Sequence, residues 1–220
     1  MHITNQEIAR FNMIEQQIRP CEIIDERVLQ VLHDVPREHF VPQDYQGLAF
    51  CDTQIPLGCH SSMMKPMQEG TMLQALEVQP GDRVLEIGTG SGFITACLLA
   101  LGGKVTSYEI DPTLSTQAGE RLATLSLPAA KLEVGDIFQA ELAEQSFDVI
   151  AVTGSVPSPA EKIEALLAPG GRLFVVQGND PVMCATLVNR TVDGAIYRDT
   201  LCETQLDALQ NVPQVASFVF

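Results

Sequence analysis

One segment constrains the fold more than any other: a short apolar run that ends in glycines and leads into a helical pattern. Residues 84–87 are the run, Gly88, Gly90 and Gly92 follow it, and Phe93 opens the helical pattern. Glycines at such a turn permit positive φ and let backbone N–H groups approach a ligand closely. Ligands of open parallel sheets bind at the carboxyl ends of the strands. The segment therefore predicts a ligand site at the end of a parallel strand.

Strand and helix patterns alternate after residue 82. Strands are expected over residues 83–87, 104–108, 131–134, 147–152 and 172–177, with a last strand over 215–220. Helices are expected over residues 93–101 and after Asp111 and Ser158. Alternation of this kind implies parallel strands joined by right-handed crossovers, and therefore a doubly wound α/β sheet.

Residues 1–80 follow a different pattern, so we expect them to form a helical and loop extension to a domain over 81–220. A capping box at Thr4–Glu7 opens one helix, which Pro20 ends, and a second helix runs from Asp25 to Pro36. Residues 37–65 are rich in Pro, Gly and polar residues and predict mostly loop, and Pro66 opens a third helix. The expected inner side chains are Ile8, Phe11, Ile14 and Ile18, then Val28, Val31, Leu32 and Val35, then Met72, Leu73 and Leu76.

Acidic residues close two strands that follow the glycine loop. Glu109 ends the second strand about twenty residues after the loop, the position from which a carboxylate accepts hydrogen bonds from ribose hydroxyls. Asp136 closes the third strand at the same edge, within reach of an adenine amino group. The apolar neighbours Ile110 and Ile137 follow these acids, and Thr153 closes the fourth strand over the same crevice. These side chains predict a nucleoside-binding cleft.

The loop itself indicates which nucleotide cofactor is bound. A dinucleotide site has the pattern GxGxxG, whose third glycine allows close helix packing beside a pyrophosphate. Phe93 stands at that third position here, and Glu86 leads directly into Gly88-Thr89-Gly90-Ser91-Gly92. An acid before the loop suits a ligand with a cationic amino acid end, so S-adenosylmethionine is the expected cofactor and NAD(P) the less favoured alternative.

Composition excludes several other classes. A net charge of -15 and a pI near 4.5 argue against a nucleic-acid partner. The start of the sequence has no basic and apolar signal pattern, and no apolar stretch is long enough to cross a bilayer. Six cysteines without CxxC spacing predict reduced thiols, a cytoplasmic location and no metal site.

Several motifs together resemble one enzyme family, the protein-L-isoaspartate O-methyltransferases. They are residues 13–20 (MIEQQIRP), 35–42 (VPREHFVP), 55–58 (IPLG), 80–92 (PGDRVLEIGTGSG) and 167–173 (LAPGGRL). The resemblance implies a Rossmann-like class I methyltransferase with a mostly parallel seven-stranded sheet and an N-terminal extension that covers the active site. It also implies methyl esterification of the α-carboxyl of isoaspartyl residues in damaged peptides or proteins. The cofactor contacts it implies are Glu86, Gly88, Gly90, Gly92, Glu109 and Asp136.

One motif departs from the family. After Pro-Leu-Gly the family usually has Gln-Thr-Ile-Ser-Gln-Pro, whose hydroxyls lie beside the reacting carboxylate, whereas this chain has Ser61-Ser62-Met63-Met64-Lys65-Pro66. Ser62 keeps a hydroxyl at the threonine position and is the expected catalytic residue. The remaining residues of the expected substrate loop are His60, Ser61, Met63, Met64 and Lys65.

The altered loop leaves three functional hypotheses open. A carboxylate acceptor is ionised at neutral pH and needs no general base, which fits isoaspartyl methylation. A rebuilt pocket around Met63, Met64 and Lys65 would instead select a different acceptor, and a hydroxyl or amine acceptor would need a base such as His60. The third hypothesis is a non-catalytic protein that only binds the cofactor.

Overall fold

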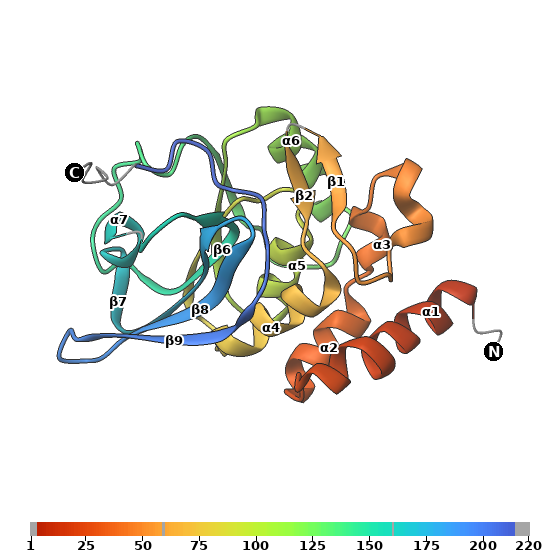
Figure 1. Ribbon diagram of the computed structural model, residues 1–220. Coiled ribbons are helices and arrows are strands. Elements are labelled where there is room, and N and C mark those ends of the chain that lie inside the picture. Colours follow the sequence, from red (N-terminus) through yellow and green to blue (C-terminus); the bar gives the residue numbers. More distant parts are fainter. Residues whose placement is uncertain (1–3, 59, 160, 214–220) are drawn as a thin grey trace.

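The computed structural model of the chain describes residues 4–58, 60–159 and 161–213 (Figure 1). At its centre is a seven-stranded sheet with the order β5-β4-β3-β6-β7-β8-β9. Strands β5, β4, β3, β6 and β7 are parallel, and β8 and β9 add antiparallel pairs at one edge. The strands are β3 (Arg83–Ile87), β4 (Lys104–Glu109), β5 (Lys131–Val134), β6 (Phe147–Val156), β7 (Leu167–Asn179), β8 (Val182–Arg190) and β9 (Ile196–Glu203). The predicted Rossmann-like, mostly parallel seven-stranded sheet is confirmed.

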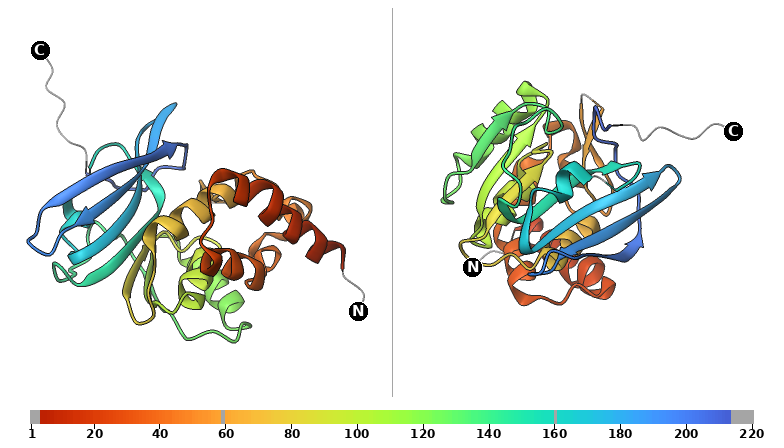
Figure 2. Two further views of the ribbon diagram at one scale, coloured as in Figure 1. Left: turned by 90° about the horizontal axis from the view of Figure 1, so that it is seen from below. Right: turned by 90° about the vertical axis from the view of Figure 1, so that its left-hand side faces the viewer.

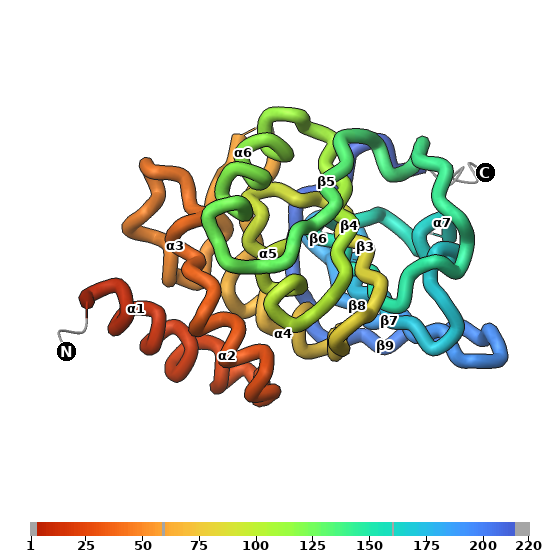
Figure 3. The backbone as a smooth tube through the Cα atoms, turned by 180° about the vertical axis from the view of Figure 1, so that it is seen from behind, coloured from red at the N-terminus to blue at the C-terminus, as the bar shows by residue number. Residues whose placement is uncertain are grey.

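Alternate residues of the central strands fill two hydrophobic cores, one on each face of the sheet, because successive side chains of a strand point to opposite faces. Val84 and Val149 belong to one core, and Leu85 and Ile150 to the other. The first core also contains side chains of α4 (Pro66–Leu76) and α5 (Phe93–Ala100), and Figure 3 shows these helices and α6 (Pro112–Leu122) between the N-terminal helices and the sheet. Ile163 of the short helix α7 (Glu161–Glu164) packs in the second core.

The N-terminal extension shares the first core. It contains α1 (Asn5–Met13), a π-helical turn over Ile14–Ile18, a 3-10 turn over Arg19–Cys21 and α2 (Glu26–Asp34). The expected inner side chains of α2 and α4 are buried, as are Ile14 and Ile18. For Ile8 and Phe11 the prediction is wrong: they are 46% and 57% exposed, because the start of α1 extends past the body of the molecule (Figure 2).

The stretch over 37–65 contains more structure than the predicted loop. It forms α3 (Arg37–Phe40), a 3-10 turn over Gln43–Leu48, and a hairpin of β1 (Ile55–Gly58) and β2 (Ser61–Met63). These elements are too short to give a helical or strand periodicity, and prolines lie within or beside them, so the sequence pattern does not mark them. The hairpin lies beside the glycine loop: a Cβ on Gly90 would be 3.3 Å from Cδ1 of Leu57.

The C-terminal part of the described chain returns to the carboxyl ends of the strands. After β9, residues 204–213 cross the end of β6, where Ser155 forms a parallel bridge with Ala208 and its hydroxyl donates to the Leu206 carbonyl at 3.0 Å. The strand expected over 215–220 lies outside the described residues. Within the described ranges, no helix combines the length and the apolar character that crossing a membrane requires.

Candidate functional site

The glycine loop lies at the carboxyl end of β3, next to β4 and β6. Gly88 has a φ of +95°, and a Cβ at this position would lie 2.3 Å from Oγ1 of Thr153. The Thr153 hydroxyl donates to the carbonyls of Ile87, at 3.0 Å, and Gly88, at 2.6 Å, and the Gly88 N–H donates to the Tyr108 carbonyl at 2.8 Å. Only glycine fits at position 88, and the two hydrogen bonds of Thr153 hold the end of β6 against the loop.

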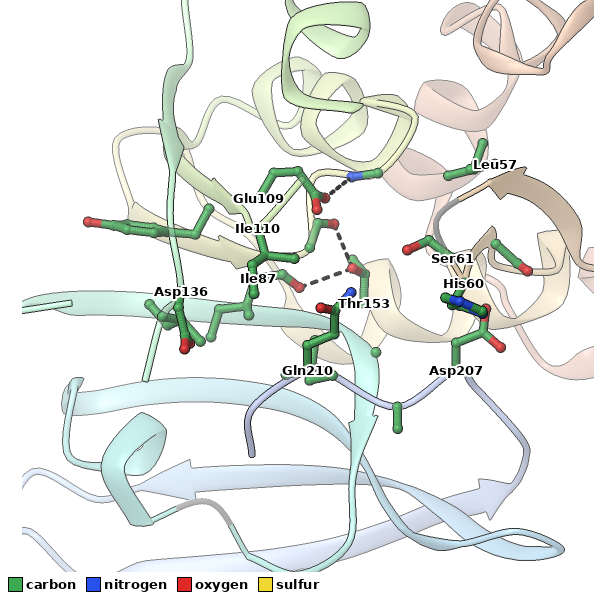
Figure 4. Close-up of a pocket in the computed structure, with 18 of the residues that line it drawn as sticks. Leu57, His60, Ser61, Ile87, Glu109, Ile110, Asp136, Thr153, Asp207 and Gln210 are labelled. Carbon is green, nitrogen blue, oxygen red and sulfur yellow. Dashed lines mark hydrogen bonds between the residues drawn. The ribbon is translucent and has the colours of Figure 1, made fainter. Parts of the chain in front are cut away.

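A cleft of about 390 Å³ opens over this loop (Figure 4). Its volume falls in the range of small-molecule and cofactor pockets. Predicted site residues that line it are His60, Ser61, Ser62, Gly88, Gly90, Glu109, Ile110, Asp136, Ile137 and Thr153. In Figure 4, Ile110 and Asp136 lie toward one end of the cleft, whereas Ser61 and His60 lie toward the other. The cleft therefore brings most of the expected cofactor residues and the hydroxyls of the expected substrate loop together.

Glu109 lies directly beside the glycine loop at the wall of the cleft. Its Oε2 accepts from the Gly90 N–H at 2.8 Å, and its Oε1 accepts from the Asp111 N–H at 3.0 Å. A carboxylate has about four acceptor positions, so both oxygens keep capacity for ligand hydroxyls. Glu109 thus both fixes the loop and presents an acceptor to the cleft.

Asp136, the second acid expected at the cofactor site, also lines the cleft. Its Oδ1 accepts from the Phe138 N–H at 2.8 Å, and its Oδ2 accepts from Nδ2 of Asn211 at 3.0 Å. Asn211 belongs to the segment over 204–213, so this segment contacts an expected cofactor residue directly. The apolar side chains of Ile110 and Ile137 line the cleft near the two acids.

Glu86 is placed differently from the other acids, because its side chain points into the core and does not line the cleft. Its Oε2 accepts from Thr95 Oγ1 at 2.5 Å and Ser107 Oγ at 2.6 Å, and Oε1 has no hydrogen-bond partner among the described residues. Burial raises the pKa of the Glu86 carboxyl to about 7, against the opposing effect of these two hydroxyls. Glu86 therefore lies behind the loop, and its predicted role at the cationic end of the cofactor stays a prediction.

The other expected loop residues fall outside the main cleft. Thr89 and Ser91 line a small adjoining cavity of about 30 Å³, together with Met63 and Met64. Both methionines are almost fully buried, at 4% and 3% exposure. Gly92 caps the start of α5, and Lys65 lies at the start of α4, where its backbone N–H donates to Gln68 Oε1 at 2.8 Å. Neither Gly92 nor Lys65 lines either cavity.

One wall of the cleft contains none of the residues predicted from the sequence. This wall is formed by residues 207–210, which are Asp207, Ala208, Leu209 and Gln210. They follow the antiparallel strands β8 and β9, after which the chain returns to the carboxyl ends of the parallel strands. The wall is fixed to β6, because the Ser155 N–H donates to the Asp207 carbonyl at 2.8 Å and the Leu209 N–H donates to the Ser155 carbonyl at 2.9 Å. No motif marks this segment, and only Asp207 is of a residue type that could have drawn attention.

The donor and acceptor set fits S-adenosylmethionine. Two carboxylates, Glu109 and Asp136, suit ribose hydroxyls and an adenine amino group, and isoleucines beside them suit an aromatic ring. At Gly88 the space that a Cβ would need is taken by Oγ1 of Thr153, and both residues line the cleft. Within the described residues, no group of three or more His, Cys, Asp or Glu side chains is arranged to hold a metal ion.

Comparison with known sequences finds one family. The family model described as protein-L-isoaspartate(D-aspartate) O-methyltransferase matches residues 9–210. A protein-L-isoaspartate O-methyltransferase of Trichlorobacter lovleyi is 35% identical over 198 residues, which cover 90% of this chain and 91% of the relative. One from Methanoculleus marisnigri is 38% identical over 179 residues, which cover 81% of this chain and 80% of the relative.

Solved structures agree on the fold. A Plasmodium falciparum protein assigned to the same family, crystallised with S-adenosyl-L-homocysteine, matches with a TM-score of 0.79 and 21% identity. The match covers 94% of this chain and 99% of that protein. At this identity the likeness shows the fold, and it extends through the N-terminal extension as well as the sheet.

Proposed function

The chain belongs to the protein-L-isoaspartate O-methyltransferase family, and we propose from that membership that it methylates the α-carboxylate of isoaspartyl residues in peptides or proteins. It is an S-adenosylmethionine-dependent methyltransferase. One observation carries the proposal: a single cleft is lined by the cofactor-type acids Glu109 and Asp136 and by Ser61 and Ser62, with Asp136 toward one end and Ser61 toward the other (Figure 4).

The residues of the cofactor end would hold the donor through complementary polar groups. Glu109 and Asp136 would accept hydrogen bonds from hydroxyl and amino groups, and Gly88 and Gly90 would allow close backbone approach. When bound, S-adenosylmethionine supplies a methyl group on a positively charged sulfur, which is already activated for transfer. The protein therefore has to position two reactants and exclude water, and positioning alone can contribute several kcal/mol, up to about 7–11.

The residues of the acceptor end would orient a carboxylate. A carboxylate is ionised at neutral pH, so its oxygen can attack without a general base. Ser62 lines both the main cleft and the small adjoining cavity, as do Gly88 and Gly90 of the glycine loop, which supports a role for Ser62 beside the bound methyl donor. We assign it the role of donating a hydrogen bond to the acceptor carboxylate, with Ser61 and His60 on the same wall.

The buried methionines support this acceptor over a rebuilt one. Met63, the last residue of β2, and Met64 are buried and do not line the main cleft, and Lys65 lies outside it. A pocket shaped by these three residues for a different acceptor therefore has no counterpart in the main cleft. The N-terminal extension contributes the hairpin that carries Ser61 and Ser62, which supports the prediction that residues 1–80 cover the active site.

The test is transfer of labelled methyl from S-adenosylmethionine to a synthetic isoaspartyl peptide and to its normal aspartyl twin. We expect base-labile label on the isoaspartyl peptide alone. Ser62→Ala should lower kcat about tenfold or more while the Kd for the cofactor stays within threefold, because the hydroxyl acts on the acceptor. Equal labelling of both peptides, or none from protein that binds the cofactor, would contradict the proposal.

The proposal includes a cytoplasmic enzyme of protein repair. Cys21, Cys51, Cys97, Cys184 and Cys202 are all free thiols in the described chain, as in proteins of a reducing compartment. Fractionation of cells that produce the protein would test the location.

A further inference from the structure

Among the residues that the structure describes, Arg37 is the largest completely buried side chain, at 0% exposure, and it begins the short helix α3. Arginine is almost never fully buried unless it is paired. Its partner is Glu69 of α4: Nε donates to Oε2 at 2.8 Å and Nη2 donates to Oε1 at 3.1 Å. The Glu69 side chain is only 2% exposed, so the two charges form a bidentate pair away from water.

The remaining contacts of the guanidinium join three other segments. Nη2 also donates to the carbonyl of Met64 at 2.8 Å, and Nη1 donates to the carbonyl of Ala49. The guanidinium carbon lies 5.6 Å from the ring centre of Phe93, which is the first residue of α5 after the glycine loop. One side chain therefore connects α4, the end of the 3-10 turn at Ala49, the end of the substrate loop and the start of α5.

These contacts lie directly behind the candidate active site. Met64 follows β2 and is two residues from Ser62, and both line the small cavity of about 30 Å³ beside the glycine loop. Glu69 and Phe93 line the same cavity, whereas Arg37 lines neither this cavity nor the cleft. The guanidinium thus contacts the back of the wall whose front carries the Ser62 hydroxyl.

Stability alone does not account for such a pair. Removing two charges from water costs several kcal/mol per ion, and apolar residues of similar volume often replace a buried pair without loss of stability. What the guanidinium adds is direction, because its planar fork fixes several acceptors at once in a way that the single ammonium of lysine cannot.

We propose that Arg37 is a positioning residue for methyl transfer, which holds the Met64 carbonyl and thereby keeps Ser62 facing the cofactor cleft. The proposal rests on the proposed function for its effect on turnover. It assigns Arg37 no contact with either reactant. Loss of the fork should therefore affect turnover and the order of the loop, and leave cofactor affinity nearly unchanged.

The test compares Arg37→Lys with Arg10→Lys. Arg10 is a control in the same extension, with a side chain that is only 14% exposed and pairs with Glu38. It also donates to the carbonyl of His33 at 3.1 Å and lies 5.9 Å from the ring centre of Phe50, and none of these partners belongs to the substrate loop. Three quantities are measured for both variants. Calorimetry gives the Kd for the cofactor, and assays with the isoaspartyl peptide give kcat and KM. Amide hydrogen exchange is followed over residues 61–64.

For Arg37→Lys we expect at least a tenfold lower kcat, a cofactor Kd within threefold of wild type, and at least tenfold faster exchange of the 61–64 amides. Arg10→Lys should keep kcat and loop exchange within twofold. Unchanged kcat and exchange in Arg37→Lys would overturn the proposal. So would equal losses of kcat in both variants, because they would show a general effect of weakened packing.

A second variant covers the case in which Arg37→Lys does not fold. Arg37→Gln combined with Glu69→Gln removes both charges together, so no uncompensated ion remains buried, and the same faster loop exchange and lower kcat are expected. Exchange and cofactor Kd do not require an acceptor. If wild-type protein failed to methylate the isoaspartyl peptide, the proposed function would fail, while loop exchange would still decide whether Arg37 holds the loop.

Discussion

At the scale of single residues, the contact between Gly88 and Thr153 is the most sensitive point of the cofactor site. Gly81 offers a matched control, since its φ of +94° is nearly that of Gly88 but its added Cβ would meet nothing within 4 Å. Both alanine variants carry the cost of a left-handed backbone, about 1–2 kcal/mol. Only Gly88→Ala also forces Thr153 Oγ1 away from the loop.

We expect Gly88→Ala to weaken cofactor binding at least tenfold and to lose a further 1–3 kcal/mol of unfolding free energy relative to Gly81→Ala, as overpacked sites typically do. Calorimetry and urea unfolding measure the two effects. Equal behaviour of the two variants would show that the close approach has no importance for the loop.

Glu86 predicts a pH dependence of stability. Its folded-state pKa of about 7 lies above the ordinary value of 4.5, so the folded protein binds a proton more tightly than the unfolded chain. The resulting stability is fully present below pH 4.5 and is lost as the pH rises through 7. A shift of this size corresponds to roughly 3 kcal/mol in total.

Urea unfolding at pH 5 and pH 8 measures this loss. The Glu86→Gln variant has no proton to release at this position. From pH 5 to pH 8, its unfolding free energy should therefore fall by roughly 3 kcal/mol less than that of wild type. Identical pH dependence of the two proteins would mean that Glu86 stays ionised in the folded state.

At the scale of elements, what could be predicted depended on periodicity. Helices α2 and α4 and strands β3 and β6 bury regular sets of apolar side chains, so composition and spacing placed them within a few residues. The β1–β2 hairpin has too few residues for a pattern, and its prolines indicated loop. The β9 strand was missed because it is exposed along nearly its whole length and shows no inner face. The β8 strand was missed as well, although it buries Met183, Ala185 and Val188.

Some residues of the candidate site could be predicted from the sequence and others could not. Residues attached to strand ends, such as Glu109 and Asp136, could be predicted because a parallel sheet brings its carboxyl ends to one edge. Residues 207–210 could not, because their position depends on hydrogen bonds to Ser155 that form only after two antiparallel strands have paired.

The segment over 204–213 yields a prediction of its own. Asn211→Ala removes the amide that holds the Asp136 carboxylate, and we expect a cofactor Kd about fivefold higher, the effect of one hydrogen bond of about 1 kcal/mol. Asn189 on β8 is the control, since its amide bonds only an exposed Asp199 at 3.5 Å, far from the cleft. Tighter binding by Asn211→Ala would show instead that Asn211 competes with the cofactor for Asp136.

At the scale of the whole molecule, charge should influence the choice of acceptor. The chain carries a net charge of -15, and most of its Lys and Arg side chains are engaged within the fold, as in the pairs Arg83–Asp148 and Arg172–Asp82. The cleft is lined by Glu109, Asp136 and Asp207, and none of the described residues that line it is Lys or Arg. Acidic walls favour cationic partners through long-range attraction.

We therefore expect an isoaspartyl peptide flanked by lysines to have a several-fold higher kcat/KM than one flanked by glutamates, with a glutamine-flanked peptide between them. Raising the salt concentration from about 20 mM to 500 mM should reduce the difference, because the screening length shortens to a few ångströms. The same ranking at both salt concentrations with undiminished ratios would point to direct contacts instead.

The wall formed by residues 207–210 has a consequence for how the protein matures on the ribosome. A nascent chain that has emerged only as far as β9 contains the glycine loop, both acids and the substrate hairpin, but it lacks the side of the cleft that Asp207 to Gln210 supply. We therefore expect a ribosome-bound chain to capture the cofactor only after this stretch has been synthesised and has docked on β6. Cofactor retention by stalled nascent chains of increasing length would locate that moment.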